Sequence, residues 1–166
     1  MRHYLTGPIA SGKSTRLAQV LAALPADTPR FGYSTRWQAP QSRGRGQLLV
    51  HDFAHPDAPP LPLDPRQPDA PATLLAVLIP LLKFPSATAV ATGGPVLAID
   101  ELGLLELRAP PVLLAQFCTA LRRALEVAAD AYLIVQQRAL PRWRPLLPPA
   151  PLQFLPELPV VTTPSP

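Results

Sequence analysis

The sequence predicts a three-layer α/β fold, in which a mostly parallel sheet carries helices on both faces. Three observations lead to this prediction. A glycine-rich phosphate-binding motif at residues 7–15 stands between an expected strand and an expected helix. Short apolar runs alternate along the chain with stretches of helical periodicity. The run at residues 96–99 is apolar throughout, which is typical of a central parallel strand covered on both faces.

The glycine-rich motif has the pattern G-x-x-x-x-G-K-[ST] of a P-loop, also called Walker A. The backbone N–H groups of such a loop, and the start of the helix that follows, point at phosphate oxygens. In this pattern Lys13 reaches the β- and γ-phosphates, and Ser14 supplies a hydroxyl ligand to Mg²⁺. A turn that merely begins a helix is the alternative, and chance matches are rare. The residues expected to hold the phosphates are Gly7, Pro8, Ile9, Ala10, Ser11, Gly12, Lys13, Ser14 and Thr15.

The composition favours one domain that covers residues 1–166. The net charge is only +4, and the arginines are scattered in loose groups, such as Arg36 with Arg43 and Arg45. A nucleic-acid surface requires a denser basic stripe, so we do not expect a nucleic-acid partner. The single cysteine, Cys118, excludes an intrachain disulfide and a zinc site built from cysteines.

The cellular location is expected to be cytoplasmic. A strand that begins at residue 2 leaves no room for a signal peptide. The longest apolar run, residues 74–82, is too short to cross a bilayer and contains Pro80. We therefore expect no contact with a membrane.

The expected elements begin with a strand over residues 2–6 that runs into the P-loop. The helix after the loop ends at Pro25 and has one buried face, formed by Leu17, Val20, Leu21 and Leu24. Residues 31–36 and 47–53 are expected to be strands that form a hairpin or a neighbouring pair.

The segment of residues 56–71 contains seven prolines, which exclude a regular helix or a central strand and predict an exposed loop. A helix over residues 72–84 follows, and Pro80 kinks or stops it. Residues 91–95 form a turn before the strand at residues 96–101.

Two prolines then open a helix. Its inner face is expected to contain Leu114, Phe117, Cys118, Leu121 and Leu125, so we assign Cys118 to packing. Residues 131–135 form another buried strand. The segment of residues 141–166 contains nine prolines and is expected to wrap the surface, with an edge strand at residues 158–163.

Two adjacent carboxylates, Asp100 and Glu101, close the strand at residues 96–101. In P-loop proteins an aspartate at the end of a buried strand holds Mg²⁺ together with the P-loop hydroxyl. We assign this role to Asp100 beside Ser14, and we assign to Glu101 the orientation and deprotonation of a water in line with the γ-phosphate. A charged strand end that simply meets solvent is the alternative interpretation.

The segment from Asp100 to Leu107, with sequence D-E-L-G-L-L-E-L, resembles the D-E-I-G-x-M-E-L signature of the small P-loop nucleoside-triphosphatases, which include cancer-related nucleoside-triphosphatase. The G-Y-S-T segment at residues 32–35 is similar to the G-F-x-T segment of that family, and Arg45-Gly46 to its R-x-G-F segment. The resemblance implies a RecA-like fold and Mg²⁺-dependent hydrolysis of nucleoside triphosphates with broad base tolerance. It also implies a supporting role for Glu106.

The function expected from these observations is a nucleoside-triphosphatase that uses Glu101 and Lys13 as catalytic residues and Mg²⁺ as cofactor. The family's C-terminal Asn-Arg pair is missing, so Arg138 is the best local candidate for a transition-state arginine, with a plain surface arginine as the alternative. Two other functions stay open. One is an ATP-dependent small-molecule kinase, and the other is a slow nucleotide-dependent switch that binds a protein partner through the proline-rich segments.

Overall fold

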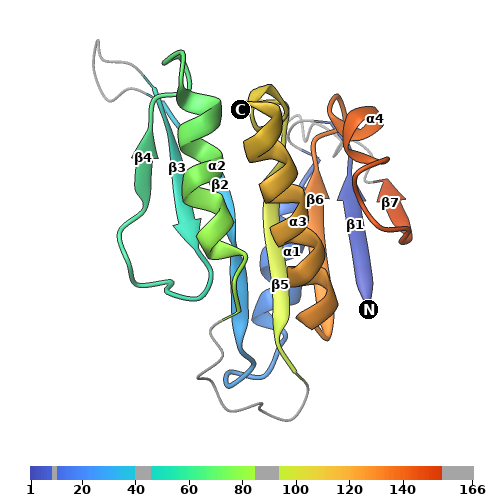
Figure 1. Cartoon of the computed structure of the whole chain (residues 1–166). Helices are drawn as coiled ribbons and strands as arrows, with labels where there is room; N and C mark the ends of the chain where they lie inside the picture. The colour runs from blue at the N-terminus through green and yellow to red at the C-terminus, as the bar shows by residue number, and fades with distance from the viewer. Residues whose placement is uncertain (9–10, 40–45, 85–93, 155–166) are drawn as a thin grey trace, which may run out of the picture.

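A computed structural model describes residues 1–8, 11–39, 46–84 and 94–154. They form a seven-stranded sheet in the order β4-β3-β2-β5-β6-β1-β7 (Figure 1). The strands are β1 (Arg2–Thr6), β2 (Arg30–Gln38), β3 (Gln47–Asp52), β4 (Leu61–Leu63), β5 (Val96–Leu102), β6 (Asp130–Val135) and β7 (Leu152–Phe154). The helices are α1 (Lys13–Ala22), α2 (Ala70–Leu81), α3 (Pro111–Val127) and α4 (Leu140–Trp143), with a 3-10 turn, η1, at Glu106–Arg108.

Most of the sheet is parallel. Strands β2, β5, β6, β1 and β7 run in one direction, and the antiparallel strands β3 and β4 extend the sheet beyond β2. The carboxyl ends of the parallel strands therefore meet at one edge, where open α/β sheets bind their ligands. The expected pairing of the strands near residues 31–36 and 47–53 is confirmed as an antiparallel hairpin.

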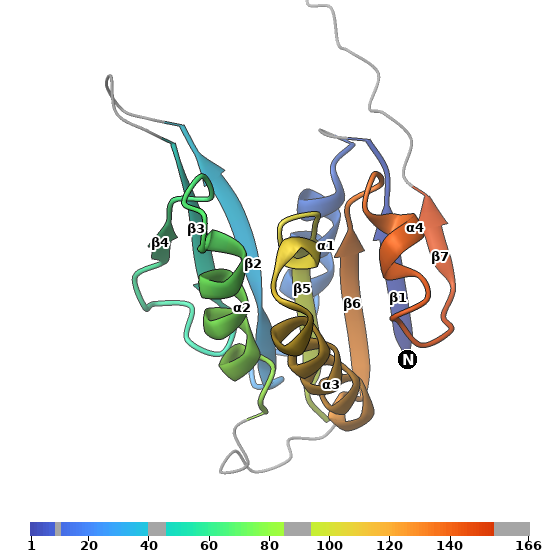
Figure 2. The same ribbon diagram turned by 45° about the horizontal axis from the view of Figure 1, so that its top comes forward.

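Helices cover both faces of the sheet, with α1 on one side and α2 and α3 on the other (Figures 1 and 2). Side chains alternate between these faces along the parallel strands. Leu5, Val96, Ala98 and Ile134 pack with Leu17 and Leu21 of α1. The residues between them, such as Tyr4, Leu97, Ile99 and Leu133, belong to the larger core under α2 and α3. The predicted three-layer α/β fold is confirmed.

The predicted inner faces of α1 and α3 are confirmed in part, because Val20, Leu24 and Leu114 are only partly buried and α1 ends at Ala22. Leu17 and Leu21 are buried on α1, and Phe117, Cys118, Leu121 and Leu125 are buried on α3. Burial raises the pKa of the Cys118 thiol, so this side chain stays protonated and packs as a small apolar group.

The loop expected over residues 56–71 differs from the structure at two places. Leu61–Leu63 forms the edge strand β4, in which Pro62 lies opposite Leu49 of β3. An edge strand tolerates proline because one of its sides needs no backbone donor. Helix α2 also begins at Ala70, earlier than expected, because Pro71 fits the first turn, where a missing N–H costs nothing. Pro80 lies inside the last turn of α2, which ends at Leu81.

The proline-rich C-terminal segment does more than wrap the surface. Trp143 in α4 is fully buried, and its ring meets that of Phe117 edge to face, with 6.0 Å between centroids. Strand β7 pairs in parallel with β1, and the Tyr4 hydroxyl donates to the carbonyl oxygen of Pro148 at 2.8 Å. The edge strand expected at residues 158–163 lies outside the described residues.

The two strands that carry the nucleotide motifs lie near each other but are not neighbours. Strand β6 separates β5 from β1. Strand β5 is central, as expected, whereas the outer neighbour of β1 in the described part of the chain is the short strand β7, which has three residues. None of the helices in the described part of the chain is long and apolar enough to span a membrane.

Candidate active site

The P-loop and the acidic pair meet at the carboxyl edge of the sheet. Strand β1 ends at Thr6, whose hydroxyl donates to the carbonyl oxygen of Val135 at the end of β6, at 2.9 Å. This buried hydrogen bond aligns the ends of the two strands immediately before the P-loop. Strand β5, on the other side of β6, carries Asp100 and Glu101 at its own end.

The P-loop passes into α1 through Gly12, which adopts the left-handed conformation with φ 78°. Glycine suits this position because other residues are strained at such angles. The first helical hydrogen bond follows directly, from the Arg16 N–H to the Gly12 carbonyl oxygen at 2.8 Å. Ile9 and Ala10 lie outside the described residues, and Thr15 is exposed on the first turn of the helix.

Lys13 is buried inside the loop, with 7% of its surface exposed. Its ammonium group donates to the carbonyl oxygens of Gly7 at 3.0 Å and Pro8 at 2.6 Å, and to the Ser11 hydroxyl at 3.4 Å. The charge is thus fixed over the loop that would hold the phosphates. A bound phosphate would have to exchange part of these hydrogen bonds for stronger, charge-assisted ones.

Ser14 links the P-loop to the acidic pair. Its hydroxyl donates to Oδ1 of Asp100 at 3.0 Å, although the two residues are 86 positions apart in the sequence. One hydroxyl and one carboxylate are the ligand set that P-loop proteins offer to Mg²⁺. The described residues contain no group of three or more His, Cys, Asp or Glu side chains suited to a metal. Mg²⁺ needs no such group, since substrate phosphates and water complete its coordination, and the residues present fit this ion.

The acidic pair lies at an irregularity of β5. Ile99 pairs with Leu133 and Leu102 pairs with Val135, so the two residues Asp100 and Glu101 lie opposite a single residue of β6. Such a β-bulge disturbs the strict alternation of side chains and is common next to active sites. The peptide bond between the two acids is cis.

The neighbouring strand β2 fixes the backbone of the acidic pair. The Thr35 hydroxyl donates to the Asp100 carbonyl oxygen and accepts from the Glu101 N–H, both at 3.4 Å. Asp100 is buried, and Glu101 is half-buried. The strand that carries the carboxylates is therefore held at the end where they lie.

Burial is the largest influence on the pKa of both Asp100 and Glu101. It raises the pKa of Asp100, and the Ser14 hydrogen bond and the charges of Arg36 and Lys13 oppose this shift. Burial also raises the pKa of Glu101, against the charge of Lys13 and together with that of Asp100. A carboxylate whose pKa is raised is a stronger base, as proton transfer from water requires.

Arg36 is one of two basic residues whose charges act on Asp100, and the sequence interpretation did not assign it to the site. Ser34 of β2 pairs with Asp100, and Arg36 lies two positions further along the same face of the strand. Ser34 and Arg36 are two positions apart in an expected strand. This spacing is the signal in the sequence that could have assigned Arg36 to the site. Arg138 is exposed after β6, and no described contact joins it to the acidic pair.

Three hydrogen bonds hold the turn that follows Glu101. Oε2 of Glu106 accepts from the Gly103 N–H at 3.1 Å, and the indole N–H of Trp143 donates to the Gly103 carbonyl oxygen at 2.8 Å. The Gln136 N–H donates to the Leu102 carbonyl oxygen at 2.9 Å. Burial raises the pKa of Glu106 to about 7. Glu106 thus holds the backbone of the turn after Glu101, and its supporting role in the site stays a prediction.

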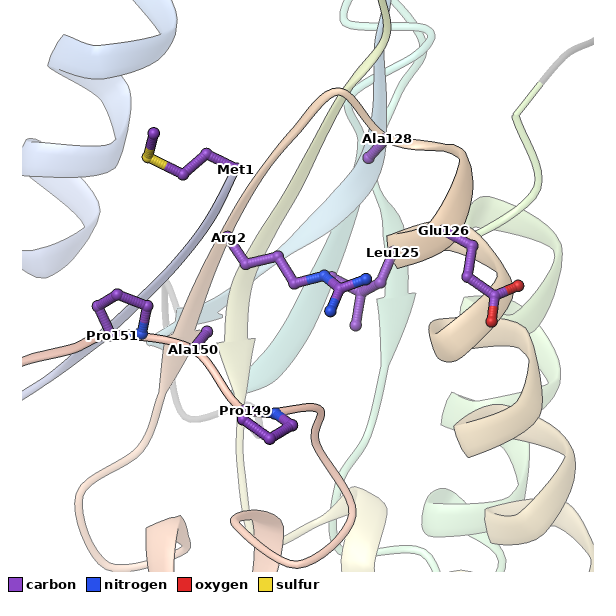
Figure 3. Close-up of a pocket in the computed structure, with 8 residues that line it drawn as sticks. All are labelled: Met1, Arg2, Leu125, Glu126, Ala128, Pro149, Ala150 and Pro151. Atoms are coloured by element: carbon purple, nitrogen blue, oxygen red, sulfur yellow. The ribbon is translucent and has the colours of Figure 1, made fainter.

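A cavity of about 350 Å³ opens beside Glu101 on the side of the sheet that carries α2. A second hollow, of about 440 Å³, lies at the opposite end of β1 from the P-loop. Figure 3 shows Arg2 extending from β1 toward α3 in this hollow, with Pro149, Ala150 and Pro151 below. It contains none of the residues expected to bind the nucleotide.

The chain is similar in structure to THEP1 from the hyperthermophile Aquifex aeolicus, a member of the cancer-related nucleoside-triphosphatase family. The match has a TM-score of 0.63 and 18% sequence identity, and it covers 94% of this chain and 90% of THEP1. No family model matches the sequence, and no curated protein matches it. The structural match shows a THEP1-like P-loop fold, which is the fold implied by the resemblance of the acidic motif.

Proposed function

We propose that the chain hydrolyses nucleoside 5'-triphosphates to diphosphate and phosphate in a Mg²⁺-dependent reaction. The hydrogen bond between Ser14 and Asp100 is the observation that carries this proposal, because it brings the P-loop hydroxyl to a strand-end carboxylate. A structural P-loop without chemistry has no need for this pair. The THEP1-like fold supports the same class of reaction.

In the proposed reaction the P-loop binds and polarises the terminal phosphate. Lys13 and the backbone N–H groups around Ser11 and Gly12 neutralise the charge that develops on the γ-phosphate oxygens. Before a phosphate binds, the Lys13 ammonium donates to oxygens of the loop itself, and part of these hydrogen bonds is exchanged for charge-assisted bonds to the phosphate. Ser14 and Asp100 would hold Mg²⁺, which would supply further positive charge to the phosphates when bound.

Glu101 acts on the attacking water. Its ionised carboxylate orients the water toward the γ-phosphorus and accepts a proton as the new P–O bond forms and the bond to the diphosphate breaks. The raised pKa of Glu101 suits it to this role, and Asp100, held by Ser14, stays available for the metal. Of the two adjacent acids, Glu101 thus acts on the water and Asp100 binds the metal.

Broad base tolerance is part of the proposal and rests on the resemblance of the acidic motif to the family signature. It is tested by phosphate release from ATP, GTP, CTP and UTP with Mg²⁺, and with the metal removed by chelation. We expect comparable turnover for all four nucleotides and none after chelation. Turnover of one nucleotide alone would contradict the proposed tolerance, and release without the metal would contradict the proposed metal site.

Three other expectations stay predictions. They are a single domain over residues 1–166, a cytoplasmic location, and a protein partner that binds through the proline-rich segments. The described residues of both halves of the chain contribute strands to one sheet, which supports the first of these.

A further inference from the structure

The cavity beside Glu101 is separate from the phosphate cradle. We call it the Glu101 pocket and define it by Thr35, Trp37, Glu101, Leu104, Glu106 and Gln136, which are among the residues that line it. None of the described P-loop residues lines it. The pocket therefore adjoins the proposed reacting end of the nucleotide without being the site for its phosphates.

The Glu101 pocket is larger than hydrolysis requires. One water occupies roughly 30 Å³ in the liquid. The pocket has a volume of about 350 Å³, so it has room for a molecule of many atoms next to the carboxylate that is proposed to hold the attacking water. This space exceeds what one attacking water fills.

The wall of the pocket contains carboxyl and amide oxygens, which accept hydrogen bonds. Oε1 of Gln136 is buried and has no hydrogen-bond partner among the described residues. Glu101 and Glu106 add two carboxyl groups to the wall. Glu101 is the carboxylate of this wall that is only half-buried, so it can accept a hydrogen bond from a ligand hydroxyl.

Another part of the pocket wall is apolar. Trp37 is 54% exposed, and its ring lies so close to the backbone of Gly46 that a Cβ atom there would clash with it. The missing side chain of Gly46 thus leaves room for the ring. Leu48, Leu74 and Leu104 extend this apolar wall. Aromatic rings stack well on an exposed indole.

We propose that the Glu101 pocket binds an aromatic alcohol and presents its hydroxyl group to Glu101 in place of the attacking water. The alcohol oxygen then forms a bond to the γ-phosphorus. The bond between the γ-phosphorus and the diphosphate oxygen breaks, and its electron pair stays with the nucleoside diphosphate. The hydroxyl proton moves to Glu101 and from there to solvent. The product is a phosphate ester of the alcohol. This inference rests on the proposed function, because it uses the same phosphate cradle and the same base.

The test follows the fate of γ-labelled ATP with Mg²⁺ in the presence of pyridoxine, uridine or 2-phenylethanol, each of which carries a ring and a primary hydroxyl. Glycerol, which lacks a ring, serves as the comparison. We expect labelled ester with at least one aromatic alcohol, formed at the expense of free phosphate, and none with glycerol at the same concentration. Free phosphate alone in every case would overturn the proposal.

Two variants test the pocket itself. Trp37→Ala and Gln136→Leu should each lower ester formation about tenfold, since they remove the stacking wall and the unpaired acceptor, and should leave phosphate release to water unchanged. Phe154→Ala is the matched control, because Phe154 is also 54% exposed but lies on β7, away from the pocket. Ester formation that survives both pocket variants would overturn the assignment. Phosphate release in the absence of alcohol reports separately on the proposed hydrolysis.

Discussion

Glu106 is the residue whose ionisation should govern stability near neutral pH. It is 3% exposed, and its pKa is raised from 4.5 to about 7 in the folded chain. Between these two values the folded state binds more protons than the unfolded state, so the free energy of unfolding falls as pH rises through this window. The full shift corresponds to about 3 kcal/mol.

Glu106→Gln should remove this pH dependence, because the amide keeps an acceptor for the Gly103 N–H and carries no charge. Relative to the parent chain, the variant should gain about 3 kcal/mol between pH 5 and pH 8 in denaturant titrations. Glu126→Gln on the exposed side of α3 is the control and should show no such gain. If the free energy of unfolding changed with pH in the same way in the parent chain and in Glu106→Gln, this would argue against a raised pKa of the Glu106 carboxyl group.

Arg36 and Arg138 allow a direct comparison at the active site. Both are exposed, but only Arg36 lies along the face of β2 that reaches Asp100. We expect Arg36→Ala to lower kcat/KM for ATP about tenfold through loss of positive charge near the phosphates, and Arg138→Ala to change it little. Steady-state rates of phosphate release from the two variants measure this difference. A larger loss of kcat/KM in Arg138→Ala than in Arg36→Ala would instead identify Arg138 as the residue that stabilises the developing charge.

At the scale of elements, the turn after β5 depends on α4. The Trp143 indole N–H donates to the Gly103 carbonyl oxygen, two residues after Glu101, while the ring packs against Phe117. Trp143→Phe keeps an aromatic ring and removes the hydrogen bond. It should cost about 1 kcal/mol of stability and lower kcat severalfold, with nucleotide affinity unchanged. Calorimetry and kinetics at saturating ATP measure the two effects, and an unchanged kcat would show that α4 does not position Glu101.

The same elements show how far the sequence determines the site. The P-loop and Asp100-Glu101 could be predicted because both are local patterns with a fixed place relative to a strand end. The hydrogen bond between Ser14 and Asp100 follows from these patterns only once the strand order is known. Arg36 was grouped with other arginines, because its significance depends on the pairing of β2 with β5.

The role of Trp143 could not be predicted. The prolines around Trp143 indicate a surface segment. The burial of Trp143 depends on its packing against Phe117, which no local sequence pattern encodes. The short strand β4 was missed for a related reason. Its pairing with β3 is a long-range contact, and Pro62 is acceptable there only because β4 is at the edge of the sheet.

At the scale of the whole molecule, nucleotide binding should stabilise the fold. A non-hydrolysable ATP analogue with Mg²⁺ at a hundred times its Kd should add about 2.7 kcal/mol, which for a chain of this size raises Tm by about 5–10 °C. Chelation of the metal should remove most of the shift, and Lys13→Ala should abolish it, because both remove positive charge from the phosphate site. A shift that survives in Lys13→Ala would place the nucleotide elsewhere on the molecule.

The central claim is that Glu101 acts on the attacking water while the P-loop binds the nucleotide. The most direct measurement compares the parent chain with Glu101→Gln, using the Kd for a Mg²⁺-nucleotide and kcat for phosphate release in parallel. We predict an unchanged Kd and a loss of turnover of at least about a hundredfold, since the amide cannot accept the proton. Full turnover in Glu101→Gln, or an equal loss of binding and turnover, would contradict the account.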